Sequence, residues 1–250
     1  MSLPAPAFTV IDALSQAVAA VCYIAVGVGA WLRARTDIRT RVFLAFSLAN
    51  VVVFGVPTAL WIRGAADPAK MPAAATAVVM AGLGVGALLL FHFTQVFPRR
   101  RPWIRTSGVQ MAVAYALAPL AIAGLVWFAP ESMAGLRPGY VLAIIVFGFP
   151  LMVLLGFVLP VAAIVSLSRS HREAYASGAL HIKRVLELVL ISQVGGGVLA
   201  VVFAPVLTAV APDSVSRLLL TAAIWALGIL TPLAFAAAVW KYDVLAVSPE

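Results

Sequence analysis

Apolar and polar residues follow one another along this chain in long blocks. From Ala73 to Phe91 the sequence is almost entirely apolar, and the block ends at His92, Gln95, Pro98 and three successive arginines. About 20 helical residues cross a hydrocarbon core of ~30 Å. This block therefore predicts a membrane-spanning helix that ends in a basic cluster.

Six further apolar blocks of similar length are bounded by Pro, Gly, Asp or basic clusters. In lipid only a helix satisfies its own backbone, and runs of this length exclude a barrel of short alternating strands. We predict an all-α fold, an integral membrane bundle of seven transmembrane helices that forms a single domain over residues 1–250. The predicted helices cover about residues 8–32, 42–62, 73–97, 109–128, 140–166, 182–210 and 218–240.

Lys and Arg fall mainly on one side of the predicted bundle. Of the 17, 13 lie in the first, third and fifth loops and the C-terminal tail, and 4 lie on the opposite side. Because cytoplasmic loops carry an excess of Lys and Arg, we predict that the N-terminus is outside and the C-terminus is cytoplasmic. Tryptophans at five predicted helix ends fit an interfacial aromatic belt: Trp31, Trp61, Trp103, Trp127 and Trp240.

The composition excludes a soluble globular domain. Hydrophobic residues make up 64% of the chain and charged residues 10%, against about 45–50% and about 25% in soluble proteins. The net charge of +8 does not indicate nucleic-acid binding, because the arginines form short clusters between apolar blocks. The single cysteine, Cys22, lies within an apolar block and has no partner in the chain for a disulfide.

Prolines and glycines interrupt several of the predicted helices. Gly82 and Gly86 have the spacing that lets two helix backbones approach closely, and we favour packing within the bundle over a dimer interface. Prolines predict kinks, which neighbouring helices tolerate inside a bundle. They are Pro57, Pro119, Pro150, Pro160, Pro205 and Pro232.

His92 lies near the predicted cytoplasmic end of the third helix. It is a candidate proton switch, because the unperturbed histidine pKa is ~6.5. It is also a candidate haem ligand opposite His181. We favour a third interpretation, a rim histidine that hydrogen bonds to a neighbouring helix. Asp12, near the outer end of the first helix, is interpreted as a solvated acid favoured by the helix dipole.

Glu187 is the second ionisable candidate. Lys183 and Arg184 precede it by four and three residues, so the three side chains share one helix face and can pair. We favour a structural ion pair at the rim, with a signal-coupling site as the alternative.

Two glutamines are neutral polar candidates. Gln95 lies near the end of the third helix, and Gln193 lies between Ser192 and the glycines of residues 195–197. The glycines indicate either a loosened helix that lines a cavity or close packing with interhelical hydrogen bonds, which we favour. Four arginines form the predicted cytoplasmic rim: Arg99, Arg100, Arg101 and Arg184.

Several classes of protein are not indicated by this sequence. A proton pump or ion-coupled transporter carries an acidic residue or a lysine near mid-bilayer, and no predicted helix has one there. A retinal protein needs a Schiff-base lysine within the last helix, whereas Lys241 lies at its end. The H-E-x-x-H, C-x-x-C, G-x-S-x-G and phosphate-loop motifs are all missing. We predict no catalysis, no cofactor and no metal.

Two stretches resemble a known family. Residues 92–98, HFTQVFP, with the arginines that follow, resemble the H-F-x-x-x-F-P exit of the third helix in a seven-helix N-terminal sensor module. That module belongs to bacterial histidine kinases and related cyclases. Pro232–Ala236, followed by Lys241–Leu245, is similar to its last helix and basic exit, and His181–Arg184 fits its sixth helix.

The resemblance implies a sensor in the bacterial inner membrane whose seventh helix leads toward a cytoplasmic PAS, kinase or cyclase domain. The sequence reaches Glu250 shortly after that exit. We therefore expect the output domain in a separate chain, or recruitment of the module as a scaffold subunit.

Three functional hypotheses follow from the sequence. The first is a non-enzymatic sensor of a membrane-borne or small apolar signal, in which a helix shift at Pro160, Pro205 or Pro232 reaches a partner at the basic rim. The second is an accessory subunit of a larger membrane complex. The third, facilitative transport of an uncharged solute, requires a continuous polar cavity, for which the polar residues are sparse. The expected partners are the lipid bilayer and other membrane or cytoplasmic protein chains, without nucleic acid.

Overall fold

The structure is a computed structural model that describes residues 5–63, 71–97, 108–129, 138–176, 178–179, 182–192, 229–243 and 245. Within these ranges the regular structure is helical and no strand occurs. Five helices in the described part are long and apolar enough to cross a membrane. The all-α helical prediction is therefore confirmed for this part, and residues 193–210 and 218–228 of the last two predicted helices lie outside it.

The first four helices match the predicted blocks closely. They are α1 (Ala5–Arg33), α2 (Ile38–Ile62), α3 (Ala73–Val96) and α4 (Gly108–Trp127). Asp37 is the N-cap of α2, because its side chain accepts a hydrogen bond from the backbone N–H of Arg39. This cap explains why α2 begins four residues before the predicted position at residue 42.

The fifth helix is longer than predicted. It runs without interruption from Pro138 to Ala176, through α5 (Pro138–Ala143), η4 (Ile144–Gly148), α6 (Phe149–Val153), η5 (Leu154–Val158) and α7 (Leu159–Ala176). The predicted end at residue 166 is wrong, and residues 167–176 of the predicted loop over residues 167–181 are helical. Polar residues end the apolar block but not the helix, because Leu167, Ser170 and Ala174 form a buried stripe along α7.

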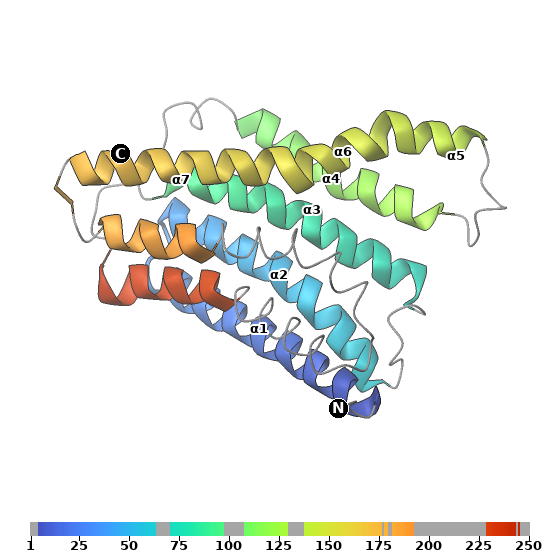
Figure 1. Ribbon diagram of the computed structural model, residues 1–250, viewed down its shortest axis with the longest axis horizontal. Coiled ribbons are helices and arrows are strands. Elements are labelled where there is room, and N and C mark those ends of the chain that lie inside the picture. Colours follow the sequence, from blue (N-terminus) through green and yellow to red (C-terminus); the bar gives the residue numbers. More distant parts are fainter. Residues whose placement is uncertain are drawn as a thin grey trace.

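Two shorter helices complete the described part. One covers residues 182–192, and the other, which we call the C-terminal helix, is Ile229–Lys241 and ends in η6 (Ala237–Lys241). In Figure 1 both lie at the same end of the molecule as the end of α7, with the C-terminal helix alongside α1.

The third helix is the centre of the arrangement. α3 contacts α2, α4, α7 and η5, whereas α1 contacts mainly α2. Figure 1 shows α1, α2 and α3 as successive slanting rods, with α4 and the fifth helix on the far side of α3. The apolar block that begins at Ala73 therefore forms the helix on which most of the others pack.

Prolines in the fifth helix coincide with π-helical turns. A proline lacks an N–H for the carbonyl four residues earlier. For Pro150 and Pro160 those carbonyls belong to Val146 and Gly156, which lie within η4 and η5. The predicted disturbance at these prolines thus takes the form of wider turns with i→i+5 hydrogen bonds.

Buried side chains form two cores of unequal size. The first core joins α1, α2, α3, α7, residues 182–192 and the C-terminal helix, and is rich in aromatic rings. Phe235 stacks on Phe43 with ring centroids 3.8 Å apart and meets the edge of Phe93 at 5.2 Å. The second core contains Leu88, Ala118 and Leu155, between α3, α4 and the fifth helix.

Glycines mark the close approaches between helices. A Cβ at Gly82 would lie 3.2 Å from Val53 of α2, as packing within the bundle requires, whereas a Cβ at Gly86 would meet no atom within 4 Å. The tightest contact of α3 is at Gly84, where a Cβ would overlap Ile122 of α4. The spacing of Gly82 and Gly86 therefore identified one real contact and missed Gly84.

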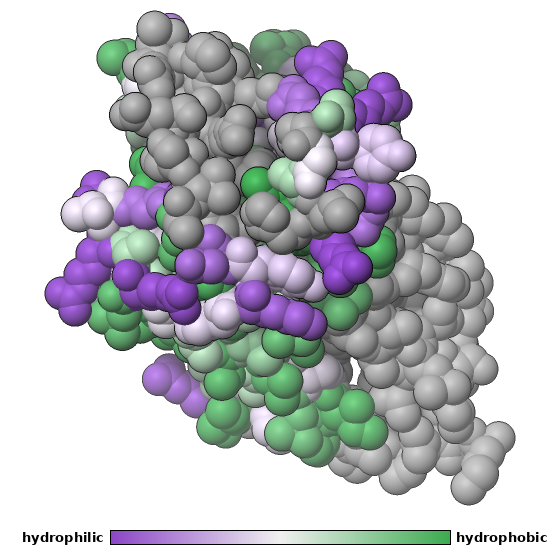
Figure 2. Space-filling view, turned by 90° about the vertical axis from the view of Figure 1, so that its left-hand side faces the viewer, coloured by the Kyte–Doolittle hydropathy of each residue, from purple (hydrophilic) through white to green (hydrophobic). Residues whose placement is uncertain are grey.

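The described basic residues gather at one end of the bundle, which we call the basic end. α1, α3 and α7 end there, at Arg33, Val96 and Ala176. Figure 2 looks onto this end and shows hydrophilic side chains spread across it. Among the described Lys and Arg, Arg63 alone lies at the opposite end, where α2 finishes. The structure thus gathers at one end of the bundle the described basic residues that the sequence placed in separate loops.

Candidate functional site

His92 makes the interhelical hydrogen bond that the sequence analysis favoured. Its Nδ1 lies 2.8 Å from the hydroxyl of Tyr115, and the two rings stack with centroids 6.0 Å apart. The contact joins α3 to α4 near the basic end. His181, the alternative haem partner, lies outside the described residues.

Gln95 belongs to a small buried polar group on α3. Its Nε2 donates to the hydroxyl of Thr94 at 3.1 Å, and the Thr94 hydroxyl donates to the carbonyl of Phe91. Ser166 of α7 donates to the Thr94 carbonyl at 3.2 Å. Because buried polar groups are costly unless paired, this group fixes α7 against α3 rather than lining a channel.

Glu187 pairs with Lys183, as predicted, and also with a residue that the sequence analysis missed. Its Oε1 lies 3.5 Å from Lys183 Nζ and 3.2 Å from His171 Nε2 of α7. The described ion pairs do not include the predicted contact with Arg184. The pair with His171 joins the end of the fifth helix to residues 182–192.

Counted along the fifth helix, this ion pair lies further from Tyr140 than a hydrocarbon core is thick. Tyr140 donates to the carbonyl of Leu125 near the end of α4. This hydrogen bond places the start of the fifth helix beside the end of α4. His171 follows 31 residues later, or about 45 Å at ~1.5 Å per residue, against a core of ~30 Å. The hydrogen bond from His171, with the charge of Lys183, holds the pKa of Glu187 below its ordinary value.

Arg39 is the most deeply buried charged residue in the described part of the chain. Its side chain is 0% exposed, and its guanidinium donates hydrogen bonds to both carboxylate oxygens of Asp37, with Nη2–Oδ2 at 2.6 Å. The same Nη2 donates to the carbonyl of Leu245 at 3.3 Å. The first turn of α2 therefore holds the segment that follows the C-terminal helix.

A second ion pair strengthens this attachment. Arg33, the last residue of α1, lies 2.9 Å from Asp243, which has a positive φ of 45°. Trp240 covers Gly29, where a Cβ would come within 3.1 Å of the indole. We call the contacts of Arg39 with Leu245 and of Arg33 with Asp243 the C-terminal latch.

Hydroxyl groups connect three helices deeper in the first core. Thr231 of the C-terminal helix donates to Ser192 at 3.2 Å, and it also hydrogen bonds to the hydroxyl of Tyr23 on α1. Ser192 in turn donates to the carbonyl of Val189. The hydrogen bonding expected around Ser192 is thus present, and it joins elements far apart in sequence.

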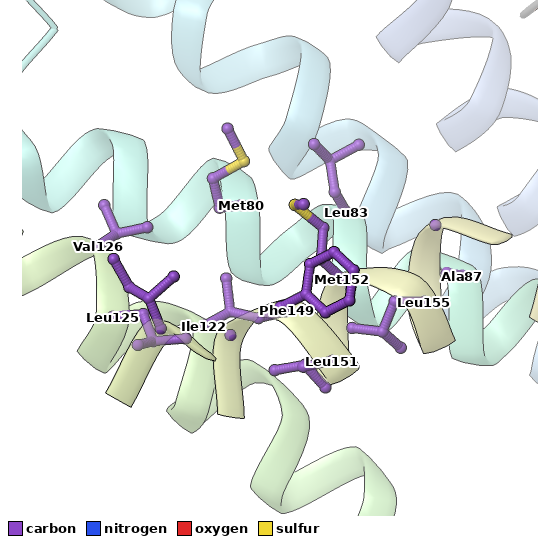
Figure 3. Close-up of a pocket in the computed structure, with 14 residues that line it drawn as sticks. Met80, Leu83, Ala87, Ile122, Leu125, Val126, Phe149, Leu151, Met152 and Leu155 are labelled. Carbon is purple, nitrogen blue, oxygen red and sulfur yellow. The ribbon is translucent and has the colours of Figure 1, made fainter. Parts of the chain in front are cut away.

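An apolar pocket lies in the other half of the bundle. Its volume is about 580 Å³, and its lining comes from the middle of α3, the end of α4 and the fifth helix from Ile144 to Gly156. Figure 3 shows carbon and sulfur alone in the lining side chains, with Phe149 and Met152 facing Leu83 and Met80. Both π-helical turns of the fifth helix contribute to the wall.

Several predicted site residues fall outside the described part of the chain. They are Gln193 and the rim arginines Arg99, Arg100 and Arg101. Asp12 lies within α1, which begins seven residues earlier at Ala5. The structure does not group His92, Gln95 and Glu187 into one site: His92 contacts α4, Gln95 contacts its neighbour Thr94, and Glu187 contacts α7.

Arg39 and His171 were not predicted as site residues from the sequence. Arg39 was counted as one more basic loop residue, although Asp37 two positions earlier is a signal for a helix cap. His171 was placed in a loop, although Leu167, Ser170 and Ala174 follow helical spacing. In the part of the chain that the structure describes, no group of three His, Cys, Asp or Glu residues lies close enough to hold a metal ion.

No protein-family model matches this sequence, and none of the curated proteins is significantly similar to it.

Proposed function

We propose that this protein is a non-enzymatic membrane sensor module that acts on a separate partner protein at its basic end. One observation carries the proposal. The same continuous helix lines the apolar pocket with its two π-helical turns and carries His171 to the contact with Glu187. A change in the contents of the pocket can therefore reach the basic end through one continuous helix.

The proposed membrane topology follows the Lys and Arg distribution. Seven helices cross the inner membrane of a bacterium, with the N-terminus outside and the basic end in the cytoplasm. The five apolar helices and the gathering of described basic residues at one end support this arrangement. The resemblance of residues 92–98 and 232–245 to a bacterial sensor module supports the same assignment.

The C-terminal latch gives the proposed signal an exit. Arg39 and Arg33 tie the residues after the C-terminal helix to the turn between α1 and α2. Movement of α7 reaches this exit through residues 182–192 and the hydroxyl chain of Ser192, Thr231 and Tyr23. A partner at the basic end would therefore meet both the end of α7 and the latched exit.

A double spin-label distance measurement tests the proposed movement. Labels at exposed Tyr175 on α7 and exposed Leu32 on α1, in the background Cys22→Ala, report the separation of the ends of these two helices at the basic end. We expect two populated distances in lipid nanodiscs, because a sensor needs two conformations. Addition of membrane extract that contains the partner should shift their proportions. One narrow distance under all conditions would contradict a sensor.

The second candidate is an accessory subunit of a membrane complex. The observation that favours it is the exposed apolar face of α4 and the fifth helix, which includes Leu117, Leu120 and Phe147. Purification from native membranes in mild detergent separates the candidates. A stoichiometric complex whose assembly depends on this face, with one fixed distance between the spin labels, would favour the subunit.

A further inference from the structure

We infer that the apolar pocket is a binding site for one hydrocarbon chain of a membrane lipid, which enters from the leaflet opposite the basic end. The inference rests on the proposed function only in naming the lipid as the sensed ligand. Lipid binding itself can be tested whether or not the protein is a sensor. Three features of the pocket carry it: its chemistry, its depth and the way in which its walls are built.

The chemistry of the wall excludes a polar ligand. The pocket has the volume of a small-molecule site, about 580 Å³, within the usual range of about 300–1,000 Å³. Such sites ordinarily contain a few polar groups that orient the ligand, whereas this one is lined by Met, Leu, Ile, Val, Phe, Ala and Gly side chains. A ligand that fits must therefore present hydrocarbon over its whole bound part.

The depth of the pocket identifies the hydrocarbon as a lipid chain. Met80 lies two turns from the start of α3, and Val126 lies next to the end of α4. The pocket thus extends from the end of α4 that lies away from the basic end to the middle of α3. Water does not fill an apolar cavity, and an empty one loses dispersion contacts along its lining. At this depth the surrounding medium is the acyl region of the bilayer.

The walls of the pocket contain free space at small residues and flexible side chains, so their shape can adjust to a ligand. Gly156 lines the pocket, and a Cβ there would meet no atom within 4 Å. Met80 and Met152 provide flexible thioether side chains, which fill irregular space without fixing one shape. The π-helical turns on the same wall interrupt the regular α-helical hydrogen bonding. An extended chain can therefore lie against the fifth helix.

Lipid retention in the whole chain tests the inference. The probe is a phosphatidylglycerol with a photoactivatable diazirine in the middle of one acyl chain, incorporated into nanodiscs before transfer to detergent. Native mass spectrometry counts the lipids retained per chain, and peptide mapping after illumination locates the cross-link. We expect one retained lipid and cross-links at α3 residues 80–87 or fifth-helix residues 144–156.

Two variants fill the pocket, and a third is the matched control. Gly156→Leu and Ala87→Leu add side chains at positions that line the pocket. Gly124→Leu adds the same side chain on α4 at open space outside the lining. We expect occupancy in the filled variants to fall about tenfold, equivalent to roughly 1.4 kcal/mol, and occupancy in the control to stay unchanged.

Three outcomes would overturn the inference. They are no retained lipid in the wild type, equal occupancy in all three variants, and cross-links confined to exposed α4 residues such as Val113 and Leu117. A variant with a lowered melting temperature is replaced by the other filled variant. Two populated spin-label distances without a retained lipid would leave the sensor proposal standing and remove the lipid as its ligand.

Discussion

The two halves of the bundle are built in different ways. Around the first core, aromatic rings stack between α2, α3 and the C-terminal helix, and a fully buried arginine closes the basic end. Around the second core, α4 and the fifth helix meet α3 through a few aliphatic side chains beside an open pocket. In the most apolar stretches, 28% of the residues are buried in each of α1, α2 and α3, but 6% in α4 and in the fifth helix.

This contrast indicates where the molecule can move. Close-packed aromatic cores respond to small changes in volume with strain, because they contain little free space. A wall that faces a pocket can shift its side chains at lower cost. We therefore expect the half around the first core to act as a frame and the pocket-lining part of the fifth helix, residues 144–156, to shift most readily against it.

The largest effect is expected from large-to-small substitutions in the two cores. Phe235→Ala removes a ring that contacts Phe43, Phe93 and Phe97, and it should lower the free energy of unfolding by about 3–5 kcal/mol. Leu155→Ala, beside the pocket, should cost about 2 kcal/mol, the low end for such a change. Unfolding by SDS in mixed micelles measures both. A larger loss for Leu155→Ala would reverse the comparison.

The buried arginine is expected to give the next effect. Arg39→Leu leaves the carboxylate of Asp37, 12% exposed, without its partner, and loss of one member of a buried pair costs about 3 kcal/mol or more. The backbone amides of the C-terminal segment should also exchange hydrogen faster, since the bond to Leu245 is lost. Arg41→Leu, at an exposed position nearby, is the matched control. Equal stability of the two variants would mean that the latch does not hold this end.

Glycine-to-alanine substitutions at two helix contacts measure how rigid the half around the first core is relative to the half around the second core. In Gly27→Ala the new Cβ would lie 2.7 Å from Cβ of Ser47, so α1 and α2 must separate, at a cost of about 1–3 kcal/mol. In Gly84→Ala the obstructing atoms are the Cδ1 atoms of Ile122 and Leu155, which can turn toward the pocket. We expect a smaller cost for Gly84→Ala in the same SDS titration. An equal cost would show that both halves are equally rigid.

The smallest effect is expected from the ion pair that joins the fifth helix to residues 182–192. Because the pKa of Glu187 is lowered in the folded protein, its contribution to stability is present above the ordinary carboxyl pKa. That contribution is lost as the pH falls through the lowered value. Glu187→Gln should remove this part of the acid dependence of the melting temperature, whereas Glu173→Gln, on exposed α7 surface, should retain it. Identical pH profiles for Glu187→Gln and the wild type would contradict the pairing.

Much of the fold was predictable because a helix that crosses lipid needs about 20 consecutive apolar residues, and the apolar blocks have this length. The bounds of α1 to α4 follow from block length, and the hydrogen bond of His92 follows from a polar group near the end of an apolar helix. The continuation to Ala176 was not predictable from hydropathy, since this polar part of the helix is packed through the buried stripe of Leu167, Ser170 and Ala174. Arg39 looked like any other basic loop residue, because its burial depends on the distant Leu245. The pocket was not predictable because it depends on how three helices pack together, and the local sequence pattern of each helix does not determine that packing.

The orientation of the bundle is the premise on which the proposed sensor rests. In the background Cys22→Ala, single cysteines at Ile62 and Tyr175 probe the two ends, because both positions are well exposed, at 71% and 66%. A membrane-impermeant maleimide applied to intact cells should label Ile62→Cys, and it should label Tyr175→Cys only after lysis. Labelling of Tyr175→Cys in intact cells, with protection of Ile62→Cys until lysis, would contradict the account.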